Sequence, residues 1–178
     1  LASFRGRPML AHVLDAATAS RTDPVIVVTG HAQDAVKRVC EAAGGSVRFV
    51  ENSNYATGLA SSLKAGFAAL PDDADGAVIL LADMPLVSAD VIDRLVAAFE
   101  DDPQVSAVIP VNQGRRGNPV LLSTRLADAI MQLEGDRGAG QILRNRDDIC
   151  EVPVADPAVL TDVDTPEALA GIERDHRG

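Results

Sequence analysis

Two runs of apolar residues constrain the fold more than any other feature of this sequence. Residues 24–29 (PVIVVT) and 77–82 (AVILLA) are continuously apolar rather than alternating, and the first is rich in β-branched residues. Such runs predict strands of a parallel sheet that are buried on both faces. An amphipathic helical pattern follows each run. The sequence therefore predicts an α/β fold in which helices cover both faces of a mostly parallel sheet.

The alternation of helix and strand continues along the chain, and no linker is long enough to divide it. Residues 1–178 are therefore expected to form one three-layer α/β/α domain with a Rossmann-like sheet, in which residues 77–82 form the central strand. A strand and a phosphate-binding loop normally precede the first helix of such a domain, so both are expected ahead of Leu1. We predict helices at residues 8–19, 31–43, 61–70, 88–100, 124–133, 139–144 and 166–174, and strands at 24–29, 46–50, 77–82, 107–111, 119–122, 149–154 and 159–163.

Composition excludes several classes of function. The formal net charge is −10, and the chain has one Tyr, four Phe and no Trp. Binding to DNA or RNA needs a basic face or an aromatic stacking surface, so no nucleic-acid partner is expected. A single nucleotide remains compatible, because backbone amides and a metal can hold its phosphates. Cys40 and Cys150 are far apart, and neither a signal peptide nor a membrane span is visible, so a cytoplasmic protein is expected.

The carboxyl ends of the strands are where open α/β sheets bind ligands. Asp83 follows residues 77–82 directly, and Pro85 comes two residues later. A carboxylate here either caps the turn before the next helix or holds a divalent metal. The position favours Mg²⁺, which takes one or two carboxylates together with substrate phosphates.

A second pair of carboxylates lies near the end of the chain. Asp162 and Asp164 alternate around Val163, and they point the same way if the backbone is extended there. Either of them could complete a metal site with Asp83. The other interpretation is that Asp164 or Thr165 caps the last predicted helix.

Three loops rich in small residues carry the remaining candidates. Residues 54–63 (NYATGLASSL) form a turn that opens a helix, where amides and serine hydroxyls can bind anions and base edges. Residues 113–119 (QGRRGNP) place two arginines between glycines, which predicts either an anion site or a hairpin with solvated arginines. Residues 135–140 (GDRGAG) could cradle part of an acceptor. No Ser-His-Asp or Cys-His arrangement accompanies them, which fits direct in-line phosphoryl transfer.

Taken in order, these motifs resemble those of the molybdenum-cofactor nucleotidyltransferases, a branch of the GT-A-like nucleotidyltransferases. The matching stretches are FRGRPMLAHVL, VVTGH, NYATGLASSL, LLADMP, GRRGNPVLL, LEGDRGAG and TDVDTPEAL, and they cover nearly the whole chain. TGLASSL and GRRGNPVLL are more similar to the cytidylyltransferase branch than to the guanylyltransferase branch. The resemblance implies transfer of CMP from CTP to the phosphate of molybdopterin, with release of pyrophosphate.

The resemblance also implies a role for each candidate residue. Asp83 would bind Mg²⁺ and contact the nucleotide, with Asp162 or Asp164 assisting at the metal. A glycine-rich loop with an arginine, and a catalytic lysine, would precede Leu1. The base would be lined by Gly58, Leu59, Ser61 and Ser62, and molybdopterin would be approached by Arg115, Asn118, Asp136 and Gly138.

Two alternatives stay open. The first keeps the fold but uses GTP with molybdopterin, or another phosphorylated acceptor, because the family often has His in place of Asn118 and Arg in place of Gly140. The second is a non-catalytic domain that delivers the cofactor to a molybdoenzyme. Transient contact with a molybdoenzyme is compatible with either, and no membrane partner is expected.

Overall fold

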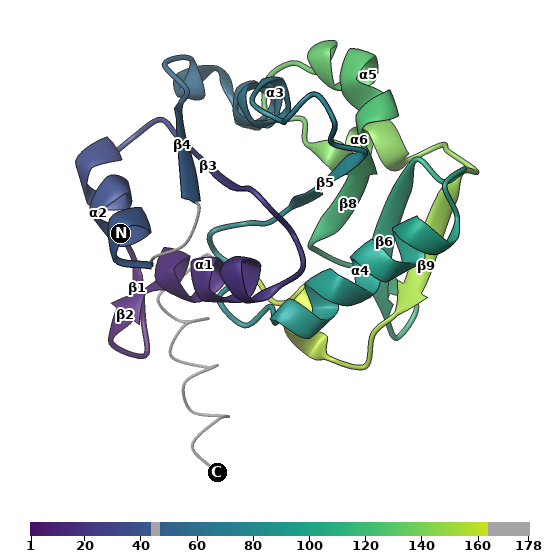
Figure 1. The fold of residues 1–178 in the computed structure, drawn as a ribbon, viewed down its shortest axis with the longest axis horizontal. Coiled ribbons are helices and arrows are strands. Elements are labelled where there is room, and N and C mark those ends of the chain that lie inside the picture. Colours follow the sequence, from purple (N-terminus) through teal and green to yellow (C-terminus); the bar gives the residue numbers. More distant parts are fainter. Residues whose placement is uncertain (44–46, 164–178) are drawn as a thin grey trace.

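Two sheets carry the fold in the computed structural model, which describes residues 1–43 and 47–163 (Figure 1). The strands are β1 Ser3–Phe4, β2 Arg7–Pro8, β3 Val25–Thr29, β4 Val47–Glu51, β5 Gly76–Ile79, β6 Ala107–Asn112, β7 Arg115–Arg116, β8 Val120–Ser123 and β9 Ile149–Pro153. The helices are α1 Met9–Ala19, α2 Gln33–Ala43, α3 Leu59–Ala68, α4 Ala89–Asp101, α5 Ala127–Met131 and α6 Ala139–Leu143, with 3₁₀ turns at Tyr55–Thr57, Thr124–Leu126 and Pro157–Leu160. A short β1–β2 hairpin precedes α1.

The α/β architecture predicted from the sequence is confirmed, but the sheet is mixed rather than mostly parallel. β3 pairs with β4 and β6 pairs with β9 in parallel, whereas β8 runs antiparallel to both β5 and β6, and β7 runs antiparallel to β6. One cause lies directly after β6, where Gln113 and Gly114 both have positive φ and form a two-residue turn. A strand that returns after so short a turn can only be antiparallel.

The pleat of β6 divides the core between the two faces of the larger sheet. Ala107 and Ile109 face a cluster built with α3, α5 and α6, while Val108 packs with α4 on the other face. Side chains of successive strand residues point to opposite faces, so this alternation gives the three layers. Helices α1 and α2 cover the small β3–β4 sheet through a third cluster that includes Leu14 and Val36.

Both long apolar runs lie at open sheet edges. Among the described residues, β3 pairs only with β4 and β5 pairs only with β8. The four residues of β5 and the first four of β3 are only half-buried. The prediction that residues 77–82 form the central strand is therefore wrong for the described part of the chain. β5 also ends at Ile79, because residues 80–82 leave the sheet to form the turn before α4.

Residues 159–163 are not the predicted strand. Asp156 caps a 3₁₀ turn there by accepting a hydrogen bond from the Ala158 amide at 2.9 Å, and Pro157 stands at its first helical position. A capping carboxylate followed by proline starts helical turns and cannot continue a strand ladder. The predicted helix at 166–174 lies outside the described residues.

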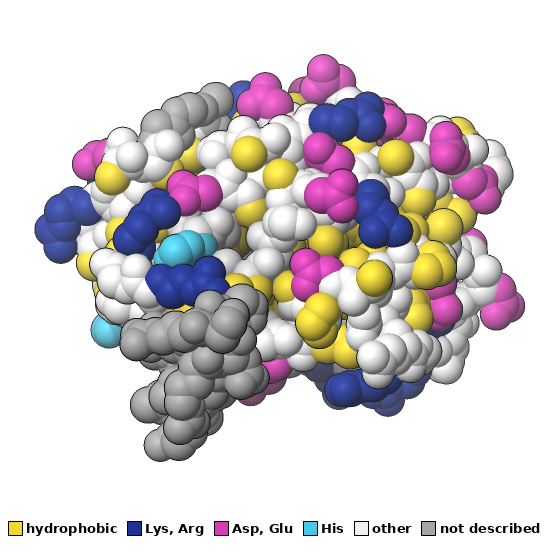
Figure 2. All heavy atoms as spheres, turned by 90° about the horizontal axis from the view of Figure 1, so that it is seen from below, with side chains coloured by type: hydrophobic (Ala, Val, Ile, Leu, Met, Phe, Trp, Pro, Cys, Tyr) yellow, Lys and Arg dark blue, Asp and Glu magenta, His cyan; other side chains and the backbone are white. Residues whose placement is uncertain are grey.

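The surface carries charges of both signs. Figure 2 shows, on one face, dark blue basic side chains scattered among magenta acidic ones rather than gathered into one patch. None of the helices in the described ranges has the length and apolar character that crossing a bilayer requires.

Candidate nucleotide-binding site

The turn that opens α3 is held against a second loop. Gly58 has φ 110°, and a methyl group added to it would collide with the backbone of Gly135 and Asp136. The Ala60 amide donates a hydrogen bond to the Gly135 carbonyl at 3.0 Å. Glycine is therefore required at position 58, both for its backbone angle and for the close approach of the two loops.

Four of the predicted site residues meet at this contact. Leu59 is 49% exposed, and its side chain lies beside Gly138, where an added methyl group would come within 3.0 Å of it. Gly58 and Leu59, predicted to line the base, are thus neighbours of Asp136 and Gly138, predicted to approach the acceptor. The contact between these two loops could not be predicted from local sequence patterns, because the loops are far apart along the chain.

A third segment joins the same surface from the end of β3. Tyr55 covers Gly30 so closely that any side chain at position 30 would overlap its ring. The rings of His31 and Tyr55 lie 6.1 Å apart at their centroids. Tyr55 remains 45% exposed, so the surface offers two exposed apolar side chains, Tyr55 and Leu59, beside the amino end of α3.

Asn52 is a site residue that the sequence analysis missed. It follows β4 and is buried, and its side chain contacts both predicted base-binding serines. Its Nδ2 donates hydrogen bonds to Ser61 Oγ at 2.8 Å and to Ser62 Oγ at 3.1 Å. The sequence does contain a signal for this residue: Asn52 comes shortly after a predicted strand and stands two positions before Asn54. Asn in that setting often forms a tight turn in which its side chain bonds the backbone two residues later.

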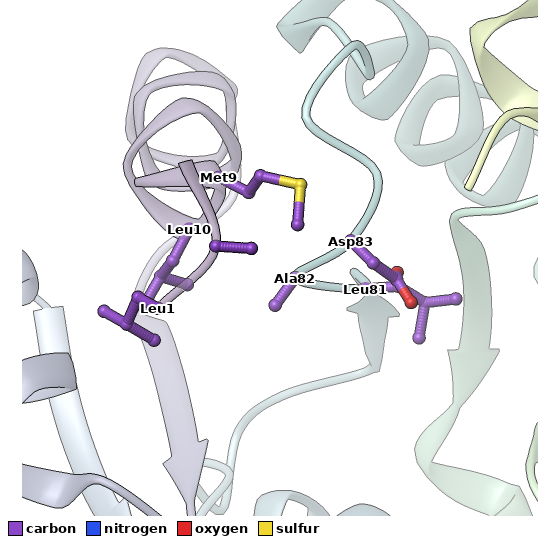
Figure 3. A pocket seen from close by; sticks show the side chains of 7 residues that line it. Leu1, Met9, Leu10, Leu81, Ala82 and Asp83 are labelled. Atoms are coloured by element: carbon purple, nitrogen blue, oxygen red, sulfur yellow. The ribbon is translucent and has the colours of Figure 1, made fainter. Parts of the chain in front are cut away.

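Asp83 lies at the end of the chain segment that leaves β5. Its Oδ1 atom is buried and has no hydrogen-bond partner among the described residues. Burying a carboxylate oxygen without a partner is unfavourable, so this atom fits a position that receives a cation. Beside Asp83 lies a pocket of about 250 Å³. Figure 3 shows its walls, with Met9 and Leu10 of α1 opposite Leu81, Ala82 and Asp83.

The late aspartate segment contacts Asp83 through the backbone. The Val163 amide donates a hydrogen bond to the Asp83 carbonyl at 2.9 Å, and the Val163 side chain is buried. Asp162 is described and exposed, whereas Asp164 lies outside the described residues. Within residues 1–43 and 47–163, no three His, Cys, Asp or Glu side chains are arranged to hold a metal ion.

The two-arginine loop forms the β6–β7 hairpin, and the residue pair that follows it contacts the 3₁₀ turn at Pro157–Leu160. The Asn118 amide donates to the Val159 carbonyl at 2.8 Å, two residues before Thr161. Arg116 forms an ion pair with Glu151 of β9, with 2.7 Å between Nε and Oε1. Arg115 is exposed and makes no ion pair with the described residues. Of the two arginines, Arg115 therefore has the guanidinium available to an anion.

The candidate residues thus form two groups. The α3 group is Asn52, Tyr55, Gly58, Leu59, Ser61, Ser62, Asp136 and Gly138; the Asp83 group is Asp83 and the neighbouring Asp162. No hydrogen bond within the described ranges joins them. In Figure 1, α3 lies at the top and the chain between β5 and α4 lies in the lower half. The four predicted acceptor-binding residues are not brought together: Asp136 and Gly138 belong to the α3 group, whereas Arg115 lies in the β6–β7 hairpin and Asn118 shortly after it.

Comparison with known proteins places the chain in a family. Residues 1–149 match the MobA-like NTP transferase domain family. Among curated relatives, the bifunctional protein GlmU of Xylella fastidiosa (strain 9a5c) is 31% identical over 162 residues, which are 91% of this chain and 28% of the relative. The chain spans about a quarter of the length of the curated relatives it matches.

Solved structures share the fold over nearly the whole chain. Rv0371c from Mycobacterium tuberculosis superposes with a TM-score of 0.81 at 25% identity, covering 98% of this chain and 88% of the other. A structure of Rv0371c complexed with manganese gives a TM-score of 0.79 at 25% identity, covering 97% and 89%. Molybdopterin-guanine dinucleotide biosynthesis protein A from Archaeoglobus fulgidus gives 0.69 at 18% identity, covering 99% and 89%, which supports the fold alone. On the match of residues 1–149, this chain belongs to the MobA-like NTP transferase domain family.

Proposed function

We propose that this protein is a nucleotidyltransferase that transfers CMP from CTP to the phosphate of molybdopterin and releases pyrophosphate. The observation that carries the proposal is the buried Oδ1 of Asp83, which has no hydrogen-bond partner in residues 1–43 and 47–163, in a chain of the MobA-like NTP transferase domain family. The likeness of TGLASSL and GRRGNPVLL to the cytidylyltransferase branch supports CTP as the donor.

In the proposed reaction, an oxygen of the acceptor phosphate attacks the α-phosphorus of CTP, and pyrophosphate leaves with the bonding electron pair. The turn that opens α3 binds the nucleotide, and Arg115 attracts the acceptor phosphate. Asp83, with Asp162 or Asp164, would hold Mg²⁺. When bound, the metal neutralises charge on the phosphates and orients them. The manganese complex of Rv0371c supports a divalent ion at this fold.

The proposed single domain includes a strand and a phosphate-binding loop ahead of Leu1. The open edges of β3 and β5 support this arrangement, because both strands are apolar and each lacks a partner on one side among the described residues. Apolar strands with open edges are prone to aggregate, and one extended segment between them would pair both.

A competition assay tests the choice of nucleotide. The full-length protein is given CTP and GTP at equal concentration, with MgCl₂ and molybdopterin, and the product is identified by mass spectrometry. The proposal expects mainly the cytidine dinucleotide. Mainly guanylylated product would replace CTP by GTP as donor. Tight nucleotide and molybdopterin binding without any product would instead favour a cofactor-delivery domain.

A further inference from the structure

The side chain of Asn52 is saturated by contacts within the α3 group. It is 5% exposed, and its backbone amide donates to the Thr29 carbonyl at 2.7 Å, which ties the ends of β3 and β4 together. Its Oδ1 accepts a hydrogen bond from the Asn54 amide at 3.0 Å. Both hydrogens of Nδ2 go to Ser61 and Ser62. Every polar atom of this side chain therefore has a partner.

These contacts fix which way the amide of Asn52 faces. A backbone N–H can only donate, so the atom that faces the Asn54 amide must be the oxygen. The nitrogen must then face the two serines, and it can only donate to them. Each serine hydroxyl consequently accepts one hydrogen bond from Asn52.

The two serines differ in where their own hydrogens go. Ser61 Oγ donates to the Gly58 carbonyl at 2.8 Å, so its hydrogen is used to hold the turn that opens α3. Ser62 is half-buried, and its hydroxyl makes no second hydrogen bond to the described residues. The hydroxyl of Ser62 therefore keeps its hydrogen for a group outside the described chain.

We propose that Asn52 is a positioning residue that turns the Ser62 hydroxyl into a hydrogen-bond donor for an acceptor atom of the nucleotide base, and confines Ser61 to holding the turn. The inference rests on the proposed function. It separates two adjacent serines that the sequence motif alone treats alike, and it assigns the reading of the base to Ser62.

Asn52→Asp tests the proposal while keeping the shape of the side chain. A carboxylate only accepts hydrogen bonds, so Ser62 would have to donate to it and could no longer donate to the base. Losing one such bond is expected to raise the Kd for CTP ~10-fold in Asn52→Asp and in Ser62→Ala. The double variant should bind no more weakly than Ser62→Ala, because both changes remove the same contact.

The kinetic readout separates positioning from a general structural role. Asn52→Asp should raise KM for CTP while kcat at saturating nucleotide stays within about threefold of wild type, since the lost contact binds the base in ground state and transition state alike. Ser61→Ala should lower the melting temperature more, and CTP affinity less, than Ser62→Ala. The comparison of Ser61→Ala with Ser62→Ala tests the inference even if Asn52→Asp does not fold.

Binding is measured by calorimetry on the full-length protein with MgCTP, alongside melting curves. Wild type that binds no nucleoside triphosphate would overturn the proposed function and this inference together. If the wild type binds CTP and either Ser62→Ala or a folded Asn52→Asp binds CTP with the same affinity, the inference is overturned but the proposed function is not. Ser61→Ala weakening CTP binding more than Ser62→Ala would also overturn it.

Discussion

Asp83 is expected to destabilise the fold while serving the proposed reaction. Because its Oδ1 is buried and has no hydrogen-bond partner in the described part of the chain, replacing Asp83 by Ala should leave the melting temperature unchanged or raise it. The same change removes a proposed metal ligand, so nucleotidyl transfer should fall by ~10³-fold or more. Turnover and a melting curve on purified Asp83→Ala check both expectations.

The matched control for that experiment is Asp72→Ala, an exposed aspartate ahead of β5. It should change neither the rate nor the melting temperature measurably. If Asp83→Ala kept a rate within tenfold of wild type, its role at the metal would be wrong.

Asp148 stabilises the fold in a way that depends on pH. Arg146 donates hydrogen bonds to its carboxylate, as does the Ser106 hydroxyl, and together they hold the pKa of Asp148 well below its usual range. A carboxyl with a lowered pKa in the folded state stabilises the protein above its ordinary pKa of about 4, and this stabilisation is lost as pH falls further. Asp148→Asn should therefore melt lower than wild type at pH 7, with the gap narrowing below about pH 4. A constant gap from pH 7 to pH 3 would contradict this account.

The turn between the 3₁₀ segment at residues 55–57 and α3 depends on glycine at one position. Gly58→Ala should destabilise the protein by roughly 1–3 kcal/mol, since alanine is strained at φ 110° and its methyl group meets the Gly135 backbone. It should also weaken nucleotide binding, because the α3 group is built around this contact. Gly140→Ala is the control, because its added methyl group meets no atom of the described residues within 4 Å and alanine favours the α6 helix. Thermal melts in which Gly140→Ala lost as much stability as Gly58→Ala would refute the packing argument.

Local patterns predicted most of the helices and strands, whereas a competing helix cap and contacts between distant residues explain where the predictions failed. The apolar period placed α1, α2 and α4 to within about two residues, and Ser88 caps α4 as expected, accepting from the Val91 amide. The strand predicted at residues 159–163 did not form, because Asp156 and Pro157 start a 3₁₀ turn that ends at Leu160. The role of Asn52 depends on serines nine and ten residues away, in another element, which a strand-or-helix pattern does not encode.

At the scale of the whole molecule, the alternation of helices and strands in the sequence predicted the α/β layers, but it did not predict which strands pair. The apolar sequence of β5 is typical of a central strand, yet β5 lies at a sheet edge in the described chain. This difference is the reason for the proposed extra strand. In the full-length protein, β3 and β5 amides should then exchange with solvent as slowly as those of β6.

The proposed phosphate loop ahead of Leu1 should gain protection from protease with MgCTP, because glycine-rich backbone loses entropy on ordering and phosphate contacts offset that loss. Fast exchange at both strands, or a loop equally protected with and without MgCTP, would contradict the arrangement.

The central claim is that the protein transfers a nucleotide to a phosphorylated acceptor, and pyrophosphate release tests it most directly. Full-length protein is mixed with CTP and MgCl₂, with and without molybdopterin, and pyrophosphate is followed over time. The account predicts release that requires molybdopterin and matches the cytidylylated product mole for mole. No pyrophosphate above the no-enzyme background, with either CTP or GTP and with folded protein, would contradict it.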